Sequence, residues 1–146
     1  MIQANELRIG NWINIQSHNQ YAQIIEIKSG RPDNRDFVRI SSPNLDTQFA
    51  VEISQINPIP LTEEILLKAG FEKESEDDKY GRVFLIPDTK YIIRIVNYGN
   101  PQKVDFGYSL EISDNKDWCG IKRIYFLHDL QNTIFALTGE DIKIEV

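Results

Sequence analysis

Apolar and polar residues alternate over residues 7–56 in short runs separated by turn-forming residues, and none of these runs has a helical period. Phe49, Val51 and Ile53, for example, share one face of an expected strand. The pattern predicts about four or five short antiparallel strands, as in a small β-barrel. An SH3-like barrel is the preferred arrangement, and an open meander packed on the second half of the chain is the alternative.

Two prolines mark the end of this all-β part. The residues before Pro58 and Pro60 are held extended, and neither proline can donate a ladder hydrogen bond in a central strand. Thr62 is a good N-cap residue and Gly70 a good helix stop. The sequence therefore predicts a stiff connector followed at once by a short helix.

Several neighbouring side chains reinforce that helix. Glu63 and Glu64 place negative charge at its positive end, while Leu61 and Leu66 occupy the two positions of a hydrophobic staple. Phe71 follows the glycine stop and is expected to fold back towards Leu66. We expect the two prolines of the connector to set the angle between the halves of the chain, with Leu61, Leu66 and Phe71 buried at their junction.

The second half mixes further strands with a second helix. Alternating residues predict strands over 82–86, 91–96 and 106–112, whereas residues 113–120 are polar and typical of a loop. The acidic run at 72–78 is expected to form a solvated loop or an edge strand.

An apolar stripe predicts the second helix over about residues 127–138, with Gly139 as its stop. The alternation of residues 142–146 indicates a terminal strand. The chain is therefore expected to be α+β: residues 1–57 form the small antiparallel barrel or meander, and residues 58–146 form an α+β unit with two helices on an antiparallel sheet. One compact two-part domain is the alternative division. The stripe consists of Leu127, Leu130, Ile134 and Leu137.

The charge balance is acidic, with 16 basic and 22 acidic residues and a net charge of −6. Most of the excess follows Pro60, where 11 basic and 16 acidic residues lie. Broad binding to nucleic acid or to an anionic membrane needs a basic surface, so both are disfavoured. No apolar run reaches membrane-spanning length, and residues 1–10 lack the pattern of a signal peptide, so a cytoplasmic protein is expected.

Three segments carry a resemblance to a known group of proteins: ANELRIGNW at 4–12, INPIPLTEEILLKAGFEK at 56–73, and IYFLHDLQNTIFALTGEDIKIE at 124–145. In this order they resemble a family of small uncharacterised proteins carried by prophages and mobile elements of anaerobic gut bacteria. The match covers about a third of the chain, and residues 128–139 are its most specific piece. The resemblance implies a cytoplasmic phage or mobile-element origin and transfers no functional residues.

Cys119, the single cysteine, is the first candidate for catalysis because His128 and Asp129 follow it. A thiol nucleophile needs a base within hydrogen-bonding reach and a third group that orients the base. Nothing in the spacing brings Cys119 to His128. We interpret Cys119 as a small buried apolar residue beside Trp118, since free cysteines are among the most buried residues.

Metal and phosphate sites are also disfavoured. The acidic run at 72–78 lacks the residue order of a calcium loop, and His18 and His128 are the only histidines, which makes a zinc site improbable. His128 is interpreted as a polar surface or capping residue near a helix start. Every glycine is isolated, so there is no phosphate-binding loop. We assign no catalytic, cofactor or metal-binding residues.

One basic and aromatic cluster supports nucleic-acid binding as an alternative. It surrounds the loop between the second and third expected strands, where cations would contact phosphates and aromatic rings would stack on bases. Asp33 and Asp36 lower its charge, and one of its aromatic residues, Phe37, fits a core position equally well. The cluster consists of Lys28, Arg31, Arg35 and Arg39 with Tyr21 and Phe37.

The sequence as a whole predicts a non-enzymatic protein that acts through a protein partner, as an accessory or host-modulating factor of a mobile element. The expectation rests on the lack of a catalytic signature, the acidic charge and the family resemblance. Binding of nucleic acid through the cluster at residues 28–39 is the alternative.

Overall fold

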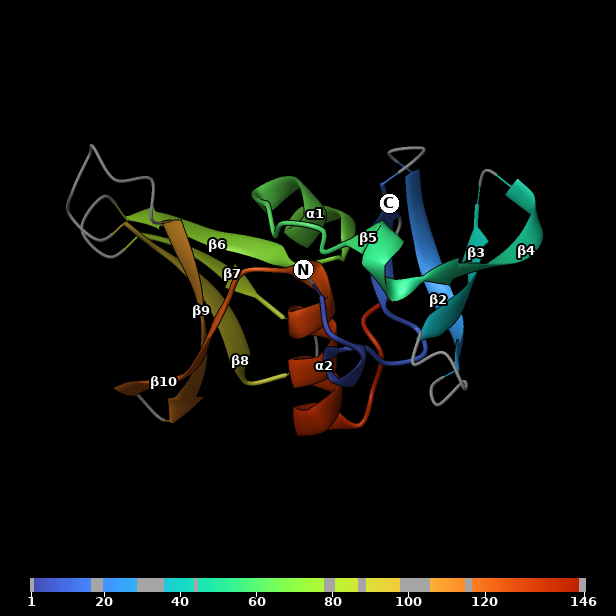
Figure 1. The fold of residues 1–146 in the computed structure, drawn as a ribbon. Coiled ribbons are helices and arrows are strands. Elements are labelled where there is room, and N and C mark those ends of the chain that lie inside the picture. Colours follow the sequence, from blue (N-terminus) through green and yellow to red (C-terminus); the bar gives the residue numbers. More distant parts are fainter. Residues whose placement is uncertain are drawn as a thin grey trace. The chain divides into compact units, whose positions relative to one another are not determined.

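The chain, drawn in Figure 1 from a computed structural model, divides into two compact units. Unit 1 comprises Met1–Pro60 and Phe126–Ile142, and unit 2 comprises Leu61–Tyr125 and Lys143–Val146. The structure describes residues 2–16, 20–28, 36–43, 45–77, 81–86, 89–97, 106–114 and 117–144, with the backbone alone at 45–47, 75–77, 81, 95–97, 106–107, 113–114 and 117–118.

The sheet of unit 1 is antiparallel throughout and curves into a half-barrel. Its strand order is β4-β3-β2-β1-β5, so four consecutive strands form a meander and β5 joins the far side of β1. Two short 3-10 turns, Ala4–Glu6 and Ile53–Gln55, flank this meander. The strands are β1 (Trp12–Ile15), β2 (Gln20–Lys28), β3 (Phe37–Ser42), β4 (Leu45–Glu52) and β5 (Ile56–Asn57).

Alternation along these strands builds the core of unit 1, because every second side chain points to the concave face. Ile13, Ile24, Val38 and Ile40 are among its fully buried members. A β-bulge between Ile24 and Glu26 in β2 adds one residue and shifts the core-facing positions by one, so that Ile27 packs against the core. The predicted all-β, barrel-like character of the N-terminal part is thus confirmed.

Helix α2 (Leu127–Thr138) has the expected bounds and ends at Gly139, which adopts a left-handed conformation with φ of 77°. It belongs to unit 1, whereas the sequence analysis grouped it with the second half of the chain. The helical period identifies an apolar face but does not say which sheet that face covers. Three members of the stripe, Leu127, Leu130 and Ile134, are buried.

The chain passes between the units along two adjacent extended segments. Within unit 1, the N–H of Leu127 donates to the carbonyl of Ile59 at 2.9 Å, and Pro60 forms a bridge with Phe126. Within unit 2, the N–H of Leu61 donates to the carbonyl of Tyr125, also at 2.9 Å. The entry to unit 2 and the exit from it therefore lie next to each other.

Unit 2 contains a five-stranded antiparallel meander whose strands follow chain order. Three of the strands were predicted, and the acidic run proved to be the edge strand β6, one of its two expected forms. The last strand was interpreted in part as a loop; as an edge strand it has a bulge between Gly120 and Lys122 and little apolar alternation. The strands are β6 (Glu72–Asp77), β7 (Gly81–Leu85), β8 (Tyr91–Asn97), β9 (Phe106–Asp114) and β10 (Asp117–Ile124).

Helix α1 (Glu63–Lys68) in unit 2 begins and ends as predicted, with Thr62 as its N-cap and Gly70 just after its C-terminus. The hydroxyl of Thr62 accepts a hydrogen bond from the N–H of Ile65 at 3.2 Å. At the other end, the N–H groups of Gly70 and Phe71 donate to the carbonyls of Leu67 and Leu66, which is the Schellman pattern around a glycine of positive φ.

The staple residues of this region are buried. Leu61, Leu66 and Phe71 are 5%, 0% and 3% exposed, so their predicted burial is confirmed, whereas their place at a junction between the halves stays a prediction. Residues 141–144, in contrast, form no strand, so the expected terminal strand is wrong over the described part of 142–146. Over the described residues the fold is α+β, with α2 in unit 1, α1 in unit 2 and a barrel-like N-terminal part.

Candidate interaction surface

The segment before β1 is a tight, internally bonded loop at residues 8–11. Gly10 takes a φ of 94°, a conformation that favours glycine, and its N–H donates to the carbonyl of Ile24 at 2.8 Å. The side-chain oxygen of Asn11 accepts from the N–H of Arg8 at 2.8 Å, while the N–H of Asn11 donates to the carbonyl of Arg8. Gly10 and Asn11 therefore form a bend, and this bend fixes the backbone from which Arg8 projects.

Gln131 on α2 ties this loop to the helix. It is 2% exposed, and its side-chain oxygen accepts from the N–H of Trp12 at 2.9 Å. Its side-chain nitrogen donates to the carbonyl of Gly10 at 3.1 Å, a carbonyl that also accepts from Gln23. A buried amide with a partner at each end locks the helix in one register on the loop.

Asn132 continues the network on the next position of α2. Its side-chain nitrogen donates to the carbonyl of Glu6 at 2.8 Å. Its oxygen accepts from the side-chain nitrogen of Asn11 at 2.8 Å and from Nε of Arg8 at 3.4 Å. Asn11 is fully buried and Asn132 is half-buried, so this amide pair is partly shielded from water, and it holds the Arg8 side chain from one side.

Two further groups orient Arg8. Its guanidinium carbon lies 4.0 Å from the centroid of the Phe135 ring, which is cation–π geometry. Its Nη2 forms an ion pair with Oδ1 of Asp141. Arg8 remains 27% exposed despite these contacts. The guanidinium is therefore held in a defined orientation and still faces solvent.

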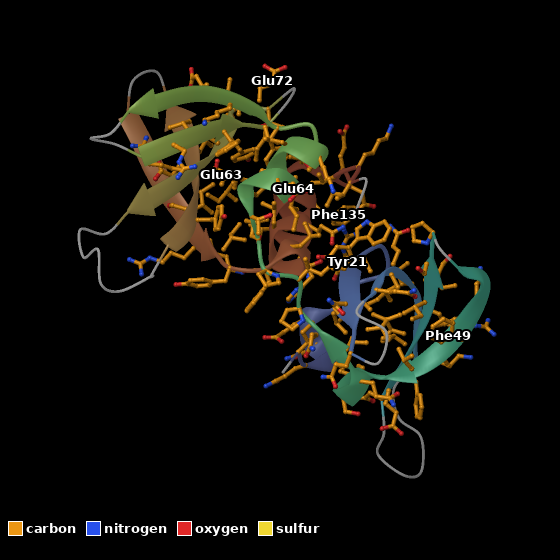
Figure 2. The ribbon with its side chains drawn as sticks, turned by 90° about the horizontal axis from the view of Figure 1, so that it is seen from above. Tyr21, Phe49, Glu63, Glu64, Glu72 and Phe135 are labelled. Carbon is orange, nitrogen blue, oxygen red and sulfur yellow. The ribbon has the colours of Figure 1, made fainter. Side chains whose placement is uncertain are left out.

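Apolar side chains are exposed beside this arginine. Ile9 is 57% exposed and Phe135 is 37% exposed. We call the set Arg8, Ile9, Asn132, Phe135 and Asp141 the Arg8–Phe135 surface; Phe135 is labelled on its helix in Figure 2. An arginine flanked by aromatic and aliphatic groups has the composition found at the energetic centres of protein interfaces.

These residues were not predicted from the sequence, although signals for them exist. Gln131 lies within the apolar stripe of α2, four residues after Leu127 and three before Ile134. A polar residue in such a stripe indicates a buried hydrogen bond. The two segments of the resemblance that meet here, ELRIGNW and LQNTIF, contain nearly all of the network.

Only part of the predicted nucleic-acid cluster lies within the described residues. Lys28 and Arg39 are both exposed, and Glu26 lies between them, 3.3 Å from Lys28 and 3.7 Å from Arg39. Arg31 and Arg35 lie outside the described residues. The one acid that both described cations contact lowers the positive charge that they present.

The strand register nevertheless gathers the described members on one face of the sheet. Lys28 pairs with Phe37 across β2 and β3, and both lie on the face opposite to Val38, which is fully buried, and Ile27, which is partly buried against the core. Tyr21, labelled on β2 in Figure 2, is 39% exposed on the same convex face. Phe37 is therefore not part of the core cluster.

Two expectations about the catalytic candidates are wrong. Cys119 is exposed, because it lies on the edge strand β10 opposite Ile112. His128 is 5% exposed and its ring stacks on that of Phe126, with centroids 5.9 Å apart. The two residues belong to different units.

Charged groups in the described part of unit 2 form two ion pairs between its elements, one of which lies close to Tyr108. Glu63 on α1 and Arg82 on β7 form an ion pair, and Tyr108 on β9 is close to both. Burial raises the pKa of Tyr108 above its ordinary value of 10.0, with a further increase from Glu63 and a decrease from Arg82. Arg94 and Glu111 pair at 3.1 Å with side chains only 16% and 13% exposed.

Within the part of the chain that the structure describes, no group of three or more His, Cys, Asp or Glu side chains is arranged to hold a metal ion. Nor does any helix there have the length and apolar character to cross a bilayer. Comparison with family models gives no match, and neither a curated protein nor a solved structure matches the chain.

Proposed function

We propose that the protein is a non-enzymatic interaction protein and that it binds a protein partner through the Arg8–Phe135 surface. The observation that carries the proposal is the orientation of Arg8 by Asn132, Asp141 and the ring of Phe135, beside the exposed side chain of Ile9. A side chain that is already ordered loses little entropy on binding, so it contributes more to affinity than a mobile one.

The biological setting follows from the family resemblance. We propose that the protein acts in the cytoplasm as an accessory or host-modulating factor of a mobile element, with its N-terminal part as an SH3-like barrel. Two of the three segments that carry the resemblance contribute the side chains of the Arg8–Phe135 surface. A shared partner within that family would explain why these segments are alike.

The test is an affinity capture from the native host, with proteins identified by mass spectrometry and nucleic acid recovered in parallel. Wild-type protein is compared with Ile9→Ser and Phe135→Ala, which remove exposed apolar groups. Leu67→Ser in unit 2 is the control, because Leu67 is 53% exposed and lies outside the surface. Circular dichroism establishes that each variant is folded.

A protein that is captured by the wild type and by Leu67→Ser, and lost from both surface variants, supports the proposal. Equal capture by all four proteins, or no specific partner at all, contradicts it. Turnover of a small substrate by the purified protein would contradict the non-enzymatic part.

Binding of single-stranded nucleic acid is the second candidate, because the register places Tyr21, Lys28, Phe37 and Arg39 on one face. Tyr21 and Lys28 are seven positions apart on β2, so the face is roughly 20 Å long at about 3.3 Å per residue, and it accommodates a few nucleotides. Arg31 and Arg35, the other predicted members of this candidate site, lie outside the described residues.

Glu26 gives this candidate a specific test, since it neutralises the two described cations. Glu26→Gln is expected to strengthen binding of a fluorescent single-stranded DNA or RNA oligonucleotide at low salt, with affinity falling steeply as salt is added. Glu52→Gln is the matched control, because it makes the same charge change opposite Phe37. Unchanged oligonucleotide mobility with wild type and with Glu26→Gln removes the candidate.

A further inference from the structure

The guanidinium of Arg8 has unused hydrogen-bonding capacity. A guanidinium carries five N–H groups in a planar fork that suits the two oxygens of a carboxylate. Nε donates to Asn132, and the contact with Asp141 runs from one terminal nitrogen to one oxygen. The internal contact therefore uses only part of the fork, whereas an incoming carboxylate can use two parallel N–H groups.

The internal contact with Asp141 is also easily displaced. Asp141 is 58% exposed, and an ion pair with so exposed a member contributes little to stability. It lies in residues 139–144, which have no regular secondary structure after the helix stop at Gly139. Nearby, the N–H of Glu140 donates to the hydroxyl of Thr138, and this bond does not involve Asp141.

The residues around Arg8 also define what lies beside the carboxylate. Phe135 lies against the guanidinium, and Ile9, the next residue in the chain after Arg8, is exposed; these apolar side chains are available to cover one aliphatic side chain of a ligand. The chain itself provides this combination, because Asp141 is followed by the half-buried Ile142. A net charge of −6 disfavours a ligand with a run of acids, so a single acid is favoured.

We propose that the Arg8–Phe135 surface recognises a partner segment with one acidic residue next to an aliphatic residue, and that Asp141–Ile142 occupies this place until the partner displaces it. This inference rests on the proposed function and names the chemistry of the partner. Asp141 then acts as an internal competitor. Partner affinity is lowered by the fraction of time that its carboxylate holds Arg8.

The experiment measures whether replacing Asp141 raises the affinity of the Arg8–Phe135 surface for an acidic peptide. The probe is a fluorescein-labelled peptide that copies residues 138–144, TGEDIKI, with both ends capped. The control peptide, TGENIKI, has asparagine in place of the aspartate. Binding to the full-length chain is followed by fluorescence anisotropy and by chemical-shift changes in amide NMR spectra, which also detect weak binding.

Asp141→Asn is expected to bind TGEDIKI about five to ten times more tightly than the wild type, which corresponds to an internal contact formed roughly 80–90% of the time. Glu140→Gln is the matched control, because it removes the same charge one residue away and no contact joins Glu140 to Arg8 among the described residues. It is expected to bind like the wild type. TGENIKI is expected to bind at least about fivefold more weakly than TGEDIKI, because it lacks the charge-assisted bonds.

Arg8→Gln in the Asp141→Asn background is expected to abolish the difference between the two peptides. If that double variant does not fold, the peptide pair on Asp141→Asn still decides the matter. Equal affinity for both peptides, or no gain over Glu140→Gln, overturns the inference.

These outcomes are separate from those of the proposed function. A partner captured through Ile9 and Phe135, together with equal binding of the two peptides, retains the proposed function and overturns the acidic specificity. Release of the captured partner by TGEDIKI, but not by TGENIKI, supports both.

Discussion

Replacing Gln131 by leucine tests whether the buried amide network holds α2 on unit 1. Leucine has nearly the volume of glutamine and a better helix propensity, so packing and helix formation are little affected. What is lost is the acceptor for the N–H of Trp12 and a donor to the carbonyl of Gly10. The Gly10 carbonyl keeps its bond from Gln23, but no other acceptor is described for the N–H of Trp12.

The expected loss in the free energy of unfolding follows from this difference between the N–H of Trp12 and the carbonyl of Gly10. The orphaned N–H of Trp12 costs about 1–3 kcal/mol, and the lost bond to the Gly10 carbonyl, which keeps its second donor, removes a net contribution of roughly 1 kcal/mol. The added apolar burial returns a part of this. We therefore expect Gln131→Leu to lower the free energy of unfolding of unit 1 by about 2–3 kcal/mol.

Tryptophan fluorescence during urea unfolding provides the assay. The chain has two tryptophans, Trp12 in unit 1 and Trp118 in unit 2, so a Trp118→Phe background makes the signal specific for unit 1. With a denaturant dependence of about 1–2 kcal/mol per molar, the midpoint is expected to fall by roughly 1–3 M urea. Leu137→Gln is the control, because it reverses the same substitution at a site on α2 that is 38% exposed.

A loss below about 0.5 kcal/mol, in the range of ordinary surface substitutions, would refute the reasoning that the amide network fixes the helix. An equal loss from Leu137→Gln would refute it too, since the effect would then reflect helix substitution in general.

Three further predictions concern other parts of the chain. Gly139→Ala should lower the stability of unit 1 by about 1 kcal/mol in the same urea assay, because the φ of 77° strains any L side chain; no atom lies within 4 Å of the added carbon, so a loss of several kcal/mol would contradict this cause. The raised pKa of Tyr108 means that folded unit 2 retains the phenolic proton above pH 10, whereas the unfolded chain releases it. The stabilising contribution of Tyr108 is thus complete below its ordinary pKa of 10.0 and is lost as the pH rises towards the raised value; alkaline unfolding curves should lose this slope in Tyr108→Phe, and an unchanged slope would refute the assignment. Cys119, which is exposed, should react completely with a thiol reagent in the native protein, and labelling that requires denaturant would show that it is covered in solution.

Local signals in the sequence predicted the elements well. Thr62 and Gly70 define both ends of α1, and Gly139 defines the end of α2, because caps depend on residues within one turn. The strands with regular alternation were likewise predicted. Strand β10 was missed in part because an edge strand with a bulge needs no apolar alternation and contains Gly120 in its middle.

Features that depend on distant contacts could not be predicted. The burial of His128 and the exposure of Cys119 depend on which elements cover them, and that information is absent from local periodicity. The same holds for the Arg8–Phe135 surface, where Arg8 and Asp141 are far apart in the sequence. Only the polar residue Gln131 in an apolar stripe pointed towards it.

The insertion of unit 2 between the two chain segments of unit 1 has a consequence for the order of folding. During synthesis, the strands of unit 1 emerge early, but α2 emerges only after all of residues 61–125. Contacts between such distant segments form slowly because a long loop must close. If unit 2 folds first, the bond between Leu61 and Tyr125 already holds the two ends of that loop together. Folding of unit 2 thereby brings the two chain segments of unit 1 together, so that α2 can pack on the strands that were synthesised earlier.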